Sequence, residues 1–314
     1  MHDLHRDKLK QEFHENKRTP EEIIELFRAI DFSLPPKMAK RLSLLSEGEG
    51  LRKNRNSHFQ DAVEISEIVD DLMGEEISGA ELNELRAACL FHDIGKSGPI
   101  EADQEEQQAF VDLFNLDFDQ KEYETEFGKK IPAELPLMIA FEIKVKEGDL
   151  TAGRAEEILR LILAASSRQK DHRLPARLSR NSTMGMFWSA HVYWTDQILQ
   201  AEKVNEEIRK VAVSHHLLDG HDPAQIGFEN ADAKIASLEL ADKYQAFRVR
   251  LILADKYQAL RKRSALTHEQ TIVILQKMIQ EKLAGKETAI AVYEKVLQTI
   301  DRHKALFERE LELA

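Results

Sequence analysis

Apolar residues recur three and four positions apart along most of this chain, a spacing that predicts amphipathic helices. Proline and glycine clusters such as Pro35-Pro36 and Gly98-Pro99 separate the periodic stretches. Glu, Lys, Leu and Ala are frequent in these stretches, and all four favour helices. The pattern predicts an all-α protein with helices over residues 20–27, 37–45, 58–73, 78–93, 154–165, 186–200, 204–216, 233–262, 267–284 and 286–314.

Two of the predicted helices also carry start signals. Ser78 with Glu81, and Thr267 with Gln270, have the spacing of a capping box. In this arrangement each side chain satisfies a backbone amide of the first turn. The two pairs therefore set the predicted starts of their helices.

Three of the apolar stripes carry a histidine at their end or in their first turn. His58 lies on the apolar face of the helix over 58–73, and His92 and His215 each end a stripe. A buried imidazole needs a partner, because an unpaired polar group in apolar surroundings costs free energy. A divalent metal ion is one such partner, and a hydrogen-bonded core histidine is the alternative at each position taken alone.

Composition limits the chemistry that these histidines can support. A single cysteine, Cys89, excludes a disulfide framework and a thiolate zinc cluster, so a metal would be held by imidazole and carboxylate. The net charge of −12 argues against a broad face for binding nucleic-acid polymers. No stretch has the pattern of a signal peptide or the length of a membrane span, so we expect a cytoplasmic protein.

The regular pattern is interrupted between about residues 100 and 180. A charged stretch follows Gly98-Pro99, and a basic loop ends the segment. Arg173 and Arg177 in that loop could hold a substrate phosphate, and a salt-bridged surface is the alternative. We interpret residues 100–180 as an insertion that borders the site. It could also contact a protein partner, as could the C-terminal helix.

A short repeat lies downstream of His215-His216. The string Leu-Ala-Asp-Lys-Tyr-Gln-Ala occurs at residues 240–246 and again at 253–259, thirteen positions apart. On one continuous helix this offset turns Asp242 and Asp255 about 140° apart, so both cannot face one site. Asp242 shares a face with apolar positions of its helix and is the first candidate, with Asp255 as the alternative.

These histidines and aspartates together form a candidate metal site. Such groups on converging helices are hard to bury without cations. Imidazole and carboxylate ligands suit iron or manganese, and also nickel or zinc. A carboxylate between two imidazole clusters can bridge two metals ~3.5–4 Å apart. The candidate ligands are His58, His92, Asp93, His191, His215, His216 and Asp242.

The order of these residues resembles the HD-GYP branch of the HD superfamily of metal-dependent phosphohydrolases. The strings His92-Asp93-Ile-Gly-Lys96 and His215-His216-Leu-Leu-Asp-Gly220 carry the resemblance, which spans roughly residues 46–283. It implies an HD-domain helical bundle with a binuclear metal centre that hydrolyses cyclic di-GMP or a related cyclic dinucleotide through a metal-bridging hydroxide. Asp93 would bridge the metals, and Lys96 would bind a phosphate oxygen, so these two are the expected catalytic residues.

The resemblance also divides the ligands between the two metals. It implies one metal on His58, His92, Asp93 and the late aspartate, and the other on Asp93, His191, His215 and His216. Asp242 follows His215 by 27 residues, close to the family's usual interval, which favours it over Asp255. The sequence after Asp255 fits the family's downstream pattern better, so both aspartates stay open.

The chain departs from the family pattern at three places. Leu217 stands where the family has Glu, and Gly220-His-Asp-Pro223 replaces Gly-Tyr-Pro. Asn54 stands where some members carry a Glu for a third metal, so we expect two metals. Asp93 and His191 are 98 residues apart, far more than in the family, which agrees with a large insertion after the His-Asp motif.

The sequence thus predicts an N-terminal helical extension over 1–50, an HD-GYP-like domain over 51–285 and a C-terminal helical segment over 286–314. The expected function is that of a two-metal phosphodiesterase or phosphohydrolase in signalling. One alternative is a degenerate regulator that binds metal and nucleotide without turnover. Another is a di-iron oxygenase, which Lys96 and the His215-His216 string disfavour.

Overall fold

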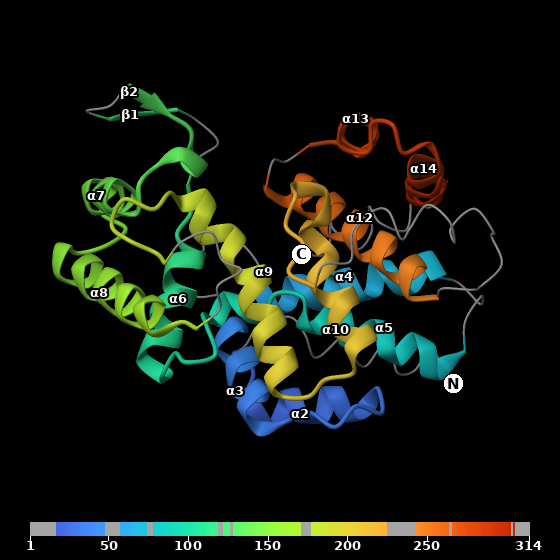
Figure 1. Ribbon diagram of the computed structural model, residues 1–314, viewed down its shortest axis with the longest axis horizontal. Helices are drawn as coiled ribbons and strands as arrows, with labels where there is room; N and C mark the ends of the chain where they lie inside the picture. Colours follow the sequence, from blue (N-terminus) through green and yellow to red (C-terminus); the bar gives the residue numbers. More distant parts are fainter. Residues whose placement is uncertain are drawn as a thin grey trace.

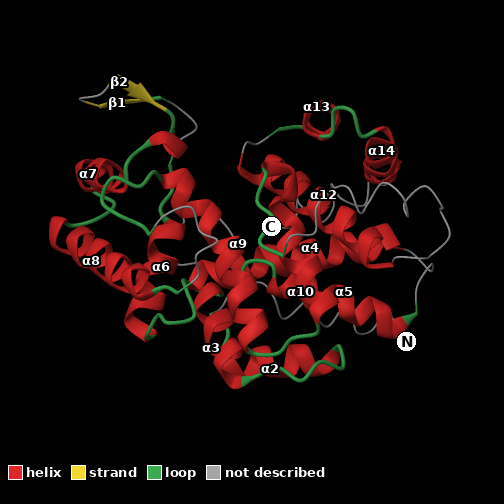
Figure 2. Cartoon of the chain, viewed as in Figure 1, coloured by secondary structure: helices red, strands yellow, loops and turns green. Residues whose placement is uncertain are grey.

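The computed structural model describes residues 17–47, 57–73, 78–118, 122–125, 128–170, 177–224, 243–263, 266–302 and residue 304. Helices make up most of this part of the chain, and one two-stranded hairpin is its only sheet (Figure 1, Figure 2). The predicted all-α class is confirmed. Within these ranges, no helix has the length and apolar character needed to cross a membrane.

The described elements are one hairpin and a series of helices. In the hairpin, β1 (Tyr123–Thr125) pairs antiparallel with β2 (Gly128–Lys130). The helices in chain order are α2 (Pro20–Ala29), α3 (Pro36–Leu45), α4 (His58–Met73), α5 (Gly79–Phe91), η1 (Ile94–Ser97), α6 (Gln104–Asn115), η2 (Pro132–Glu134), α7 (Leu137–Glu147), α8 (Ala152–Arg168), α9 (Met184–Ala201), α10 (Glu206–Ala212), η3 (Val213–Asp219), α12 (Lys243–Arg263), α13 (His268–Lys282) and α14 (Glu287–Arg302).

Helix starts follow the capping chemistry of the sequence. The predicted boxes at Ser78 and Thr267 are both confirmed, with Glu81 and Gln270 bonding back to the capping residue. Another box, at Asp103, starts α6, in the charged stretch for which the sequence pattern predicted no helix. The Asp-x-x-Glu spacing there is the signal that was missed.

The helix predicted over 204–216 ends earlier than expected. α10 stops at Ala212, and the chain continues as the tighter helix η3, where His216 leaves the helical region at φ −105° and ψ 15°. Neighbouring residues of a regular α-helix point about 100° apart. The departure at His216 accompanies the convergence of the rings of His215 and His216 on His191.

The described residues build two hydrophobic cores. The first lies among α2, α3, α4, α5, α10, α12, α13 and α14. The second lies among α6, α7 and α8, which stand to the left in Figure 1. α9 runs between them and serves both, since Ile198 and Leu199 belong to the first core and Phe187 and Trp194 to the second.

The turn after α5 packs tightly against α9. A Cβ on Gly95 would lie 2.0 Å from the carbonyl oxygen of His191 and 2.5 Å from the amide nitrogen of Thr195, so only glycine fits there. The Thr195 hydroxyl accepts from the Gly95 amide at 3.0 Å and donates to the His92 carbonyl at 3.1 Å. These contacts fix the His-Asp turn against the helix that carries His191.

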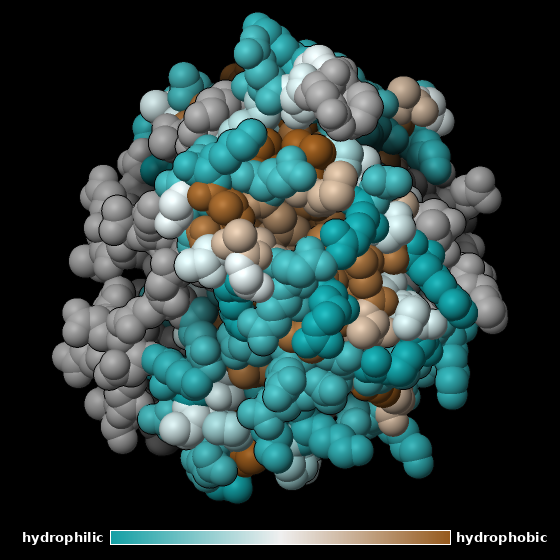
Figure 3. All heavy atoms as spheres, turned by 90° about the vertical axis from the view of Figure 1, so that its left-hand side faces the viewer, coloured by the Kyte–Doolittle hydropathy of each residue, from teal (hydrophilic) through white to brown (hydrophobic). Residues whose placement is uncertain are grey.

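The outer face of the second core is partly apolar. A cavity of about 370 Å³ lies between α7 and α8, with Met138, Phe141, Val145 and Leu159 among its lining residues. In the view onto this side of the molecule, apolar residues gather in the middle of a largely hydrophilic face (Figure 3). Charged side chains such as Lys146 and Glu156 line the same cavity.

Candidate metal centre

The structure brings four of the predicted histidine ligands together around the Asp93 carboxylate. One oxygen, Oδ1, lies 3.2 Å from His191 Nε2 and 3.8 Å from His215 Nε2. The other oxygen, Oδ2, lies 3.5 Å from His92 Nε2. His216 joins from η3, with its ring centroid 4.5 Å from that of His215 and 5.1 Å from that of His191.

Three of these histidines form the tightest group. One ligand atom from each of His191, His215 and His216 lies within 4.8 Å of the others, so the three could hold a single ion. His191 and His215 are buried, and His216 is partly exposed. The group therefore has a protected interior and one side that reaches solvent.

The histidine rings are oriented by hydrogen bonds from their Nδ1 atoms. His92 Nδ1 lies 2.6 Å from the Cys89 carbonyl, and His215 Nδ1 lies 2.9 Å from the Ala212 carbonyl. His191 Nδ1 makes the same contact with the Trp188 carbonyl. A carbonyl only accepts, so each Nδ1 must carry the proton. In the neutral ring Nε2 then presents a lone pair towards Asp93.

Two residues to which the sequence pattern gave no role support His216. Asp219 Oδ2 lies 2.5 Å from His216 Nδ1 and also accepts from the ammonium of Lys256. A metal-binding histidine often donates the hydrogen of its non-coordinating ring nitrogen to a carboxylate, as His216 Nδ1 does to Asp219. The carboxylate fixes the tautomer and the orientation of the ring. The spacing His-x-x-Asp was visible in the sequence, whereas the approach of Lys256 from α12 was not.

His58 differs from the other histidines. Its Nδ1 lies 3.1 Å from Lys96 Nζ, which also donates to Asp93 Oδ2. An ammonium only donates, so His58 Nδ1 is an acceptor and the neutral ring carries its proton on Nε2. The Lys96 ammonium thus lies between His58 and Asp93. A metal shared by these two residues requires Lys96 to move away.

Burial and charge set the protonation of the centre. Burial alone would raise the pKa of the Asp93 carboxyl, but Lys96, His92 and His191 outweigh it and hold that pKa well below its usual value. Burial lowers the pKa of His191 despite Asp93, and it lowers the pKa of His215 and His216 well below the usual value. An anionic carboxylate among neutral imidazoles is the protonation state that binds metals.

The remaining predicted residues lie elsewhere. Asp242 and Arg173 fall outside the described residues. Asp255 lies on α12, and within the described ranges it forms no hydrogen bond or ion pair with the site histidines. Arg177 is exposed. In the basic segment around it, Arg168 pairs with Glu106 and Arg180 with Glu156, as the salt-bridged alternative predicts.

The segment predicted as an insertion contributes an aromatic ring to the site. Phe114 on α6 has its ring centroid 5.8 Å from that of His191 and 6.3 Å from that of His58, edge-on to both. It also packs against Phe187 at 4.4 Å. The sequence pattern assigned Phe114 no role, since no periodic signal placed it beside the histidines.

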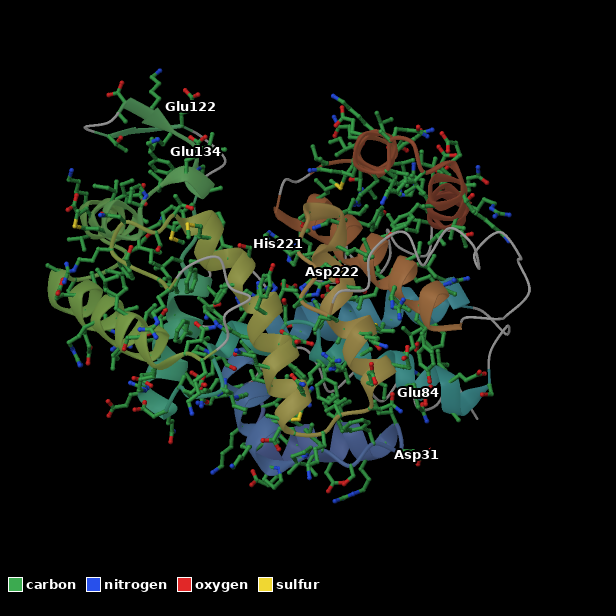
Figure 4. All side chains as sticks on the ribbon, in the orientation of Figure 1. Asp31, Glu84, Glu122, Glu134, His221 and Asp222 are labelled. Carbon is green, nitrogen blue, oxygen red and sulfur yellow. The ribbon has the colours of Figure 1, made fainter. Side chains whose placement is uncertain are left out.

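The turn after η3 lies near the same centre. Figure 4 labels His221 and Asp222 there, beside the upper part of α9. The His221 ring lies 6.5 Å from the His216 ring and 6.3 Å from the Tyr193 ring.

No family model matches the chain, and neither does any curated protein or solved structure. Function is therefore inferred from the site and from the motifs.

Proposed function

We propose that the chain is a metal-dependent phosphohydrolase that acts on a phosphodiester, with cyclic di-GMP or a related cyclic dinucleotide as the first substrate class. The observation that carries the proposal is the convergence of the Nε2 atoms of His92, His191 and His215 on Asp93. Each of these rings has its Nδ1 proton engaged by a carbonyl. Lone pairs aimed at one carboxylate are what a cation site needs.

The donor set fits a divalent metal. Imidazole with carboxylate suits manganese, iron, zinc or nickel, and His191, His215, His216 and Asp93 would hold the ion. Such an ion, when bound, polarises a phosphoryl oxygen and lowers the pKa of a water ligand towards neutrality. A second ion beside His58 and His92 is compatible with the ligand types, provided that Lys96 leaves its place between His58 and Asp93.

Two lysines support phosphate as the ligand class of the proposed site. Lys96 contacts Asp93, and Lys256 contacts Asp219, within a chain of net charge −12. A phosphate dianion or diester would gain from both ammonium groups, since charge-assisted hydrogen bonds are stronger than neutral ones. Lys96 can exchange its contact with Asp93 for one with a phosphate oxygen, which would place the substrate and free the carboxylate for metal.

A second candidate function is that of a binding regulator without turnover. It is favoured by the same Lys96 contact, because an ammonium between His58 and Asp93 would limit the site to one ion. Such a protein would bind metal and nucleotide through the same residues. It would not convert the nucleotide.

Metal content and turnover measured together test the proposal. The full chain is purified without chelators, its metals are counted, and cyclic di-GMP is followed by chromatography after addition of manganese or iron. We expect conversion by the wild type and a loss of at least ~100-fold in Asp93→Asn. Asp31→Asn is the matched control, because Asp31 is exposed at the end of α2, far from the centre, and its positive φ of 54° suits Asn (Figure 4).

The outcomes separate the candidates. Conversion that depends on metal and on Asp93 supports the phosphohydrolase. Metal binding with nucleotide binding but no conversion supports the regulator. A wild type that binds no divalent metal at micromolar concentrations contradicts both.

A further inference from the structure

A cavity of about 610 Å³ lies at the foot of the molecule, away from the histidines. One wall is α3, the second is the segment 100–107 after η1, and the third is the C-terminal end of α9. These three elements lie side by side at the lower left of the first core (Figure 1). The volume falls within the range of small-molecule sites, and none of the metal-centre residues lines it.

The floor of the cavity is apolar. Met38 and Ile198 are almost fully buried there, and Ala102 lies beside them. Leu44 and the partly exposed Ile100 continue the apolar surface towards the opening. A ligand with an apolar or aromatic body would bury this surface, and each buried Å² of apolar area is worth about 25 cal/mol.

The opening of the cavity is basic. Its lining holds four cationic side chains against two acidic ones, Glu47 and Glu202. Lys17 pairs with Glu47, which leaves Lys37 and Lys40 as exposed cations with no ion pair in the described part of the chain. Both are on α3, three positions apart, and so lie on one face of that helix. In a protein of net charge −12 this face would attract an anion.

The fourth cation, Arg41, joins the cavity to the metal centre. Its guanidinium is buried and donates to the carbonyls of Ser97, Gly98 and Pro99 at 2.9–3.2 Å. Burial lowers the pKa of Arg41 to about 10, against the raising effect of Glu202 and Glu101. The segment that Arg41 holds begins one residue after Lys96, so a ligand in the cavity would touch the support of the His-Asp turn.

We propose that this cavity binds a small organic anion, with its phosphate, sulfate or carboxylate at Lys37 and Lys40 and its apolar body against Met38 and Ile198. Metabolites that carry one such group on an aromatic or aliphatic body are the ligand class. Gln104 and Gln107 at the rim supply amide groups that can select among them. Binding here does not depend on the phosphohydrolase activity proposed above.

Fluorescence titration with anilinonaphthalenesulfonate tests the site, because this probe joins a sulfonate to apolar rings. The full chain is titrated as wild type, as the double variant Lys37→Glu with Lys40→Glu, and as Leu44→Trp, which fills the cavity without changing charge. The control is Lys129→Glu with Lys130→Glu, the same change of charge on the hairpin. Circular dichroism checks that each variant is folded, and Leu44→Phe replaces the Trp variant if it is not.

We expect a saturable site whose affinity falls at least about tenfold in both cavity variants and stays within about twofold of wild type in the hairpin control. Loss in the lysine variant alone would mean surface attraction and would overturn the proposal. Loss in Leu44→Trp alone would mean an apolar site without anion recognition and would overturn it too. Equal loss in the hairpin control, or no loss anywhere, would likewise contradict the proposal.

Discussion

The Nε2 atoms of His191 and His215 lie 3.0 Å apart, although the Nδ1 atom of each ring bonds to a backbone carbonyl. Because each Nδ1 carries the proton of its ring, the Nε2 atoms of two neutral rings would point their lone pairs at each other. A shared proton or a cation between the two nitrogens removes this conflict. A bound metal should therefore stabilise the fold as well as equip the site.

Metal addition is expected to raise the free energy of unfolding. At a free metal concentration of 100 times Kd, linkage gives about 2.7 kcal/mol, provided that the unfolded chain binds no metal. His215→Ala should abolish this gain, whereas His221→Ala, on the neighbouring turn, should keep it. Chemical denaturation with and without manganese measures the effect, and an equal gain in the two variants would contradict the ligand assignment.

Asp219→Asn is expected to weaken metal binding about 10- to 100-fold, the usual effect of removing a carboxylate that orients a ligand histidine. The Asp219 carboxylate can only accept from His216 Nδ1, which lies 2.5 Å away. An amide at this position could instead donate to Nδ1 and so favour the tautomer with its proton on Nε2, which is the wrong one for a metal ligand. Competition with a chromophoric chelator gives the affinity. Unchanged affinity in Asp219→Asn would show that His216 is not a ligand or needs no support.

Gly95→Ala should destabilise the protein by about 3 kcal/mol or more, since the added methyl group meets the His191 carbonyl and the Thr195 amide. It should also reduce metal binding, because Asp93 and His191 can no longer approach. Gly153→Ala is the matched control. Nothing lies within 4 Å of a Cβ there, so its stability should be unchanged or higher by up to about 1 kcal/mol. Urea denaturation measures the free energy of unfolding of both variants, and an equal change in the two would contradict the prediction.

Phe114 is expected to contact substrate if the proposed activity is correct. Its ring lies edge-on to His191 and His58 and is only partly buried. Stacking of a base on an aromatic ring is worth about 1–3 kcal/mol, so Phe114→Leu should weaken cyclic dinucleotide binding roughly 5- to 150-fold. Metal content should not change.

A buried phenylalanine that packs away from the histidines gives the control for that measurement. Phe118 contacts Tyr123 and Trp188. Phe118→Leu should leave nucleotide affinity near that of the wild type. Equal losses in the two variants would assign the effect to packing of the second core.

Glu64 is expected to make stability depend on pH. Burial raises the pKa of its carboxyl, although Lys262 opposes the shift. The folded state then binds the Glu64 proton more tightly than the unfolded state. This contribution is complete below the unfolded pKa and is lost as pH rises through the folded value. Glu64→Gln should therefore gain stability relative to wild type between about pH 4 and pH 7.

Urea denaturation of wild type and Glu64→Gln at about pH 4 and pH 7 measures the difference in their free energies of unfolding. Glu25→Gln serves as the control, because it removes the same charge at an exposed position of α2. A Glu64→Gln variant that loses stability relative to wild type as pH rises would show that the Lys262 and Gln258 contacts outweigh burial.

The elements that the sequence predicted best are those with local causes. Ser78 and Thr267 start helices because their own side chains and those three positions later satisfy the first amides. The histidines that end apolar stripes, His92 and His215, are buried because the stripes are. Local periodicity carries this information, so one sequence is enough to obtain it.

The parts that escaped prediction depend on contacts between distant segments. Lys256 reaches Asp219 only because α12 crosses η3, and Phe114 reaches His191 only because aromatic rings of α6 pack against the N-terminal half of α9. The contact of Lys96 with His58 likewise joins α4 to η1. The spacing of residues within one helix does not predict which distant helix it will contact.

α9 contributes its N-terminal part to one core and its C-terminal end to the other, and this bears on the ancestry of the chain. If residues 100–180 were gained by an older helical bundle, Phe187 and Trp194 have since adapted to them. Deleting the segment now would leave those aromatic rings in water and invite aggregation. Later sequences could then change the loops of residues 100–180 but could not lose the segment, so its gain would be irreversible in evolution.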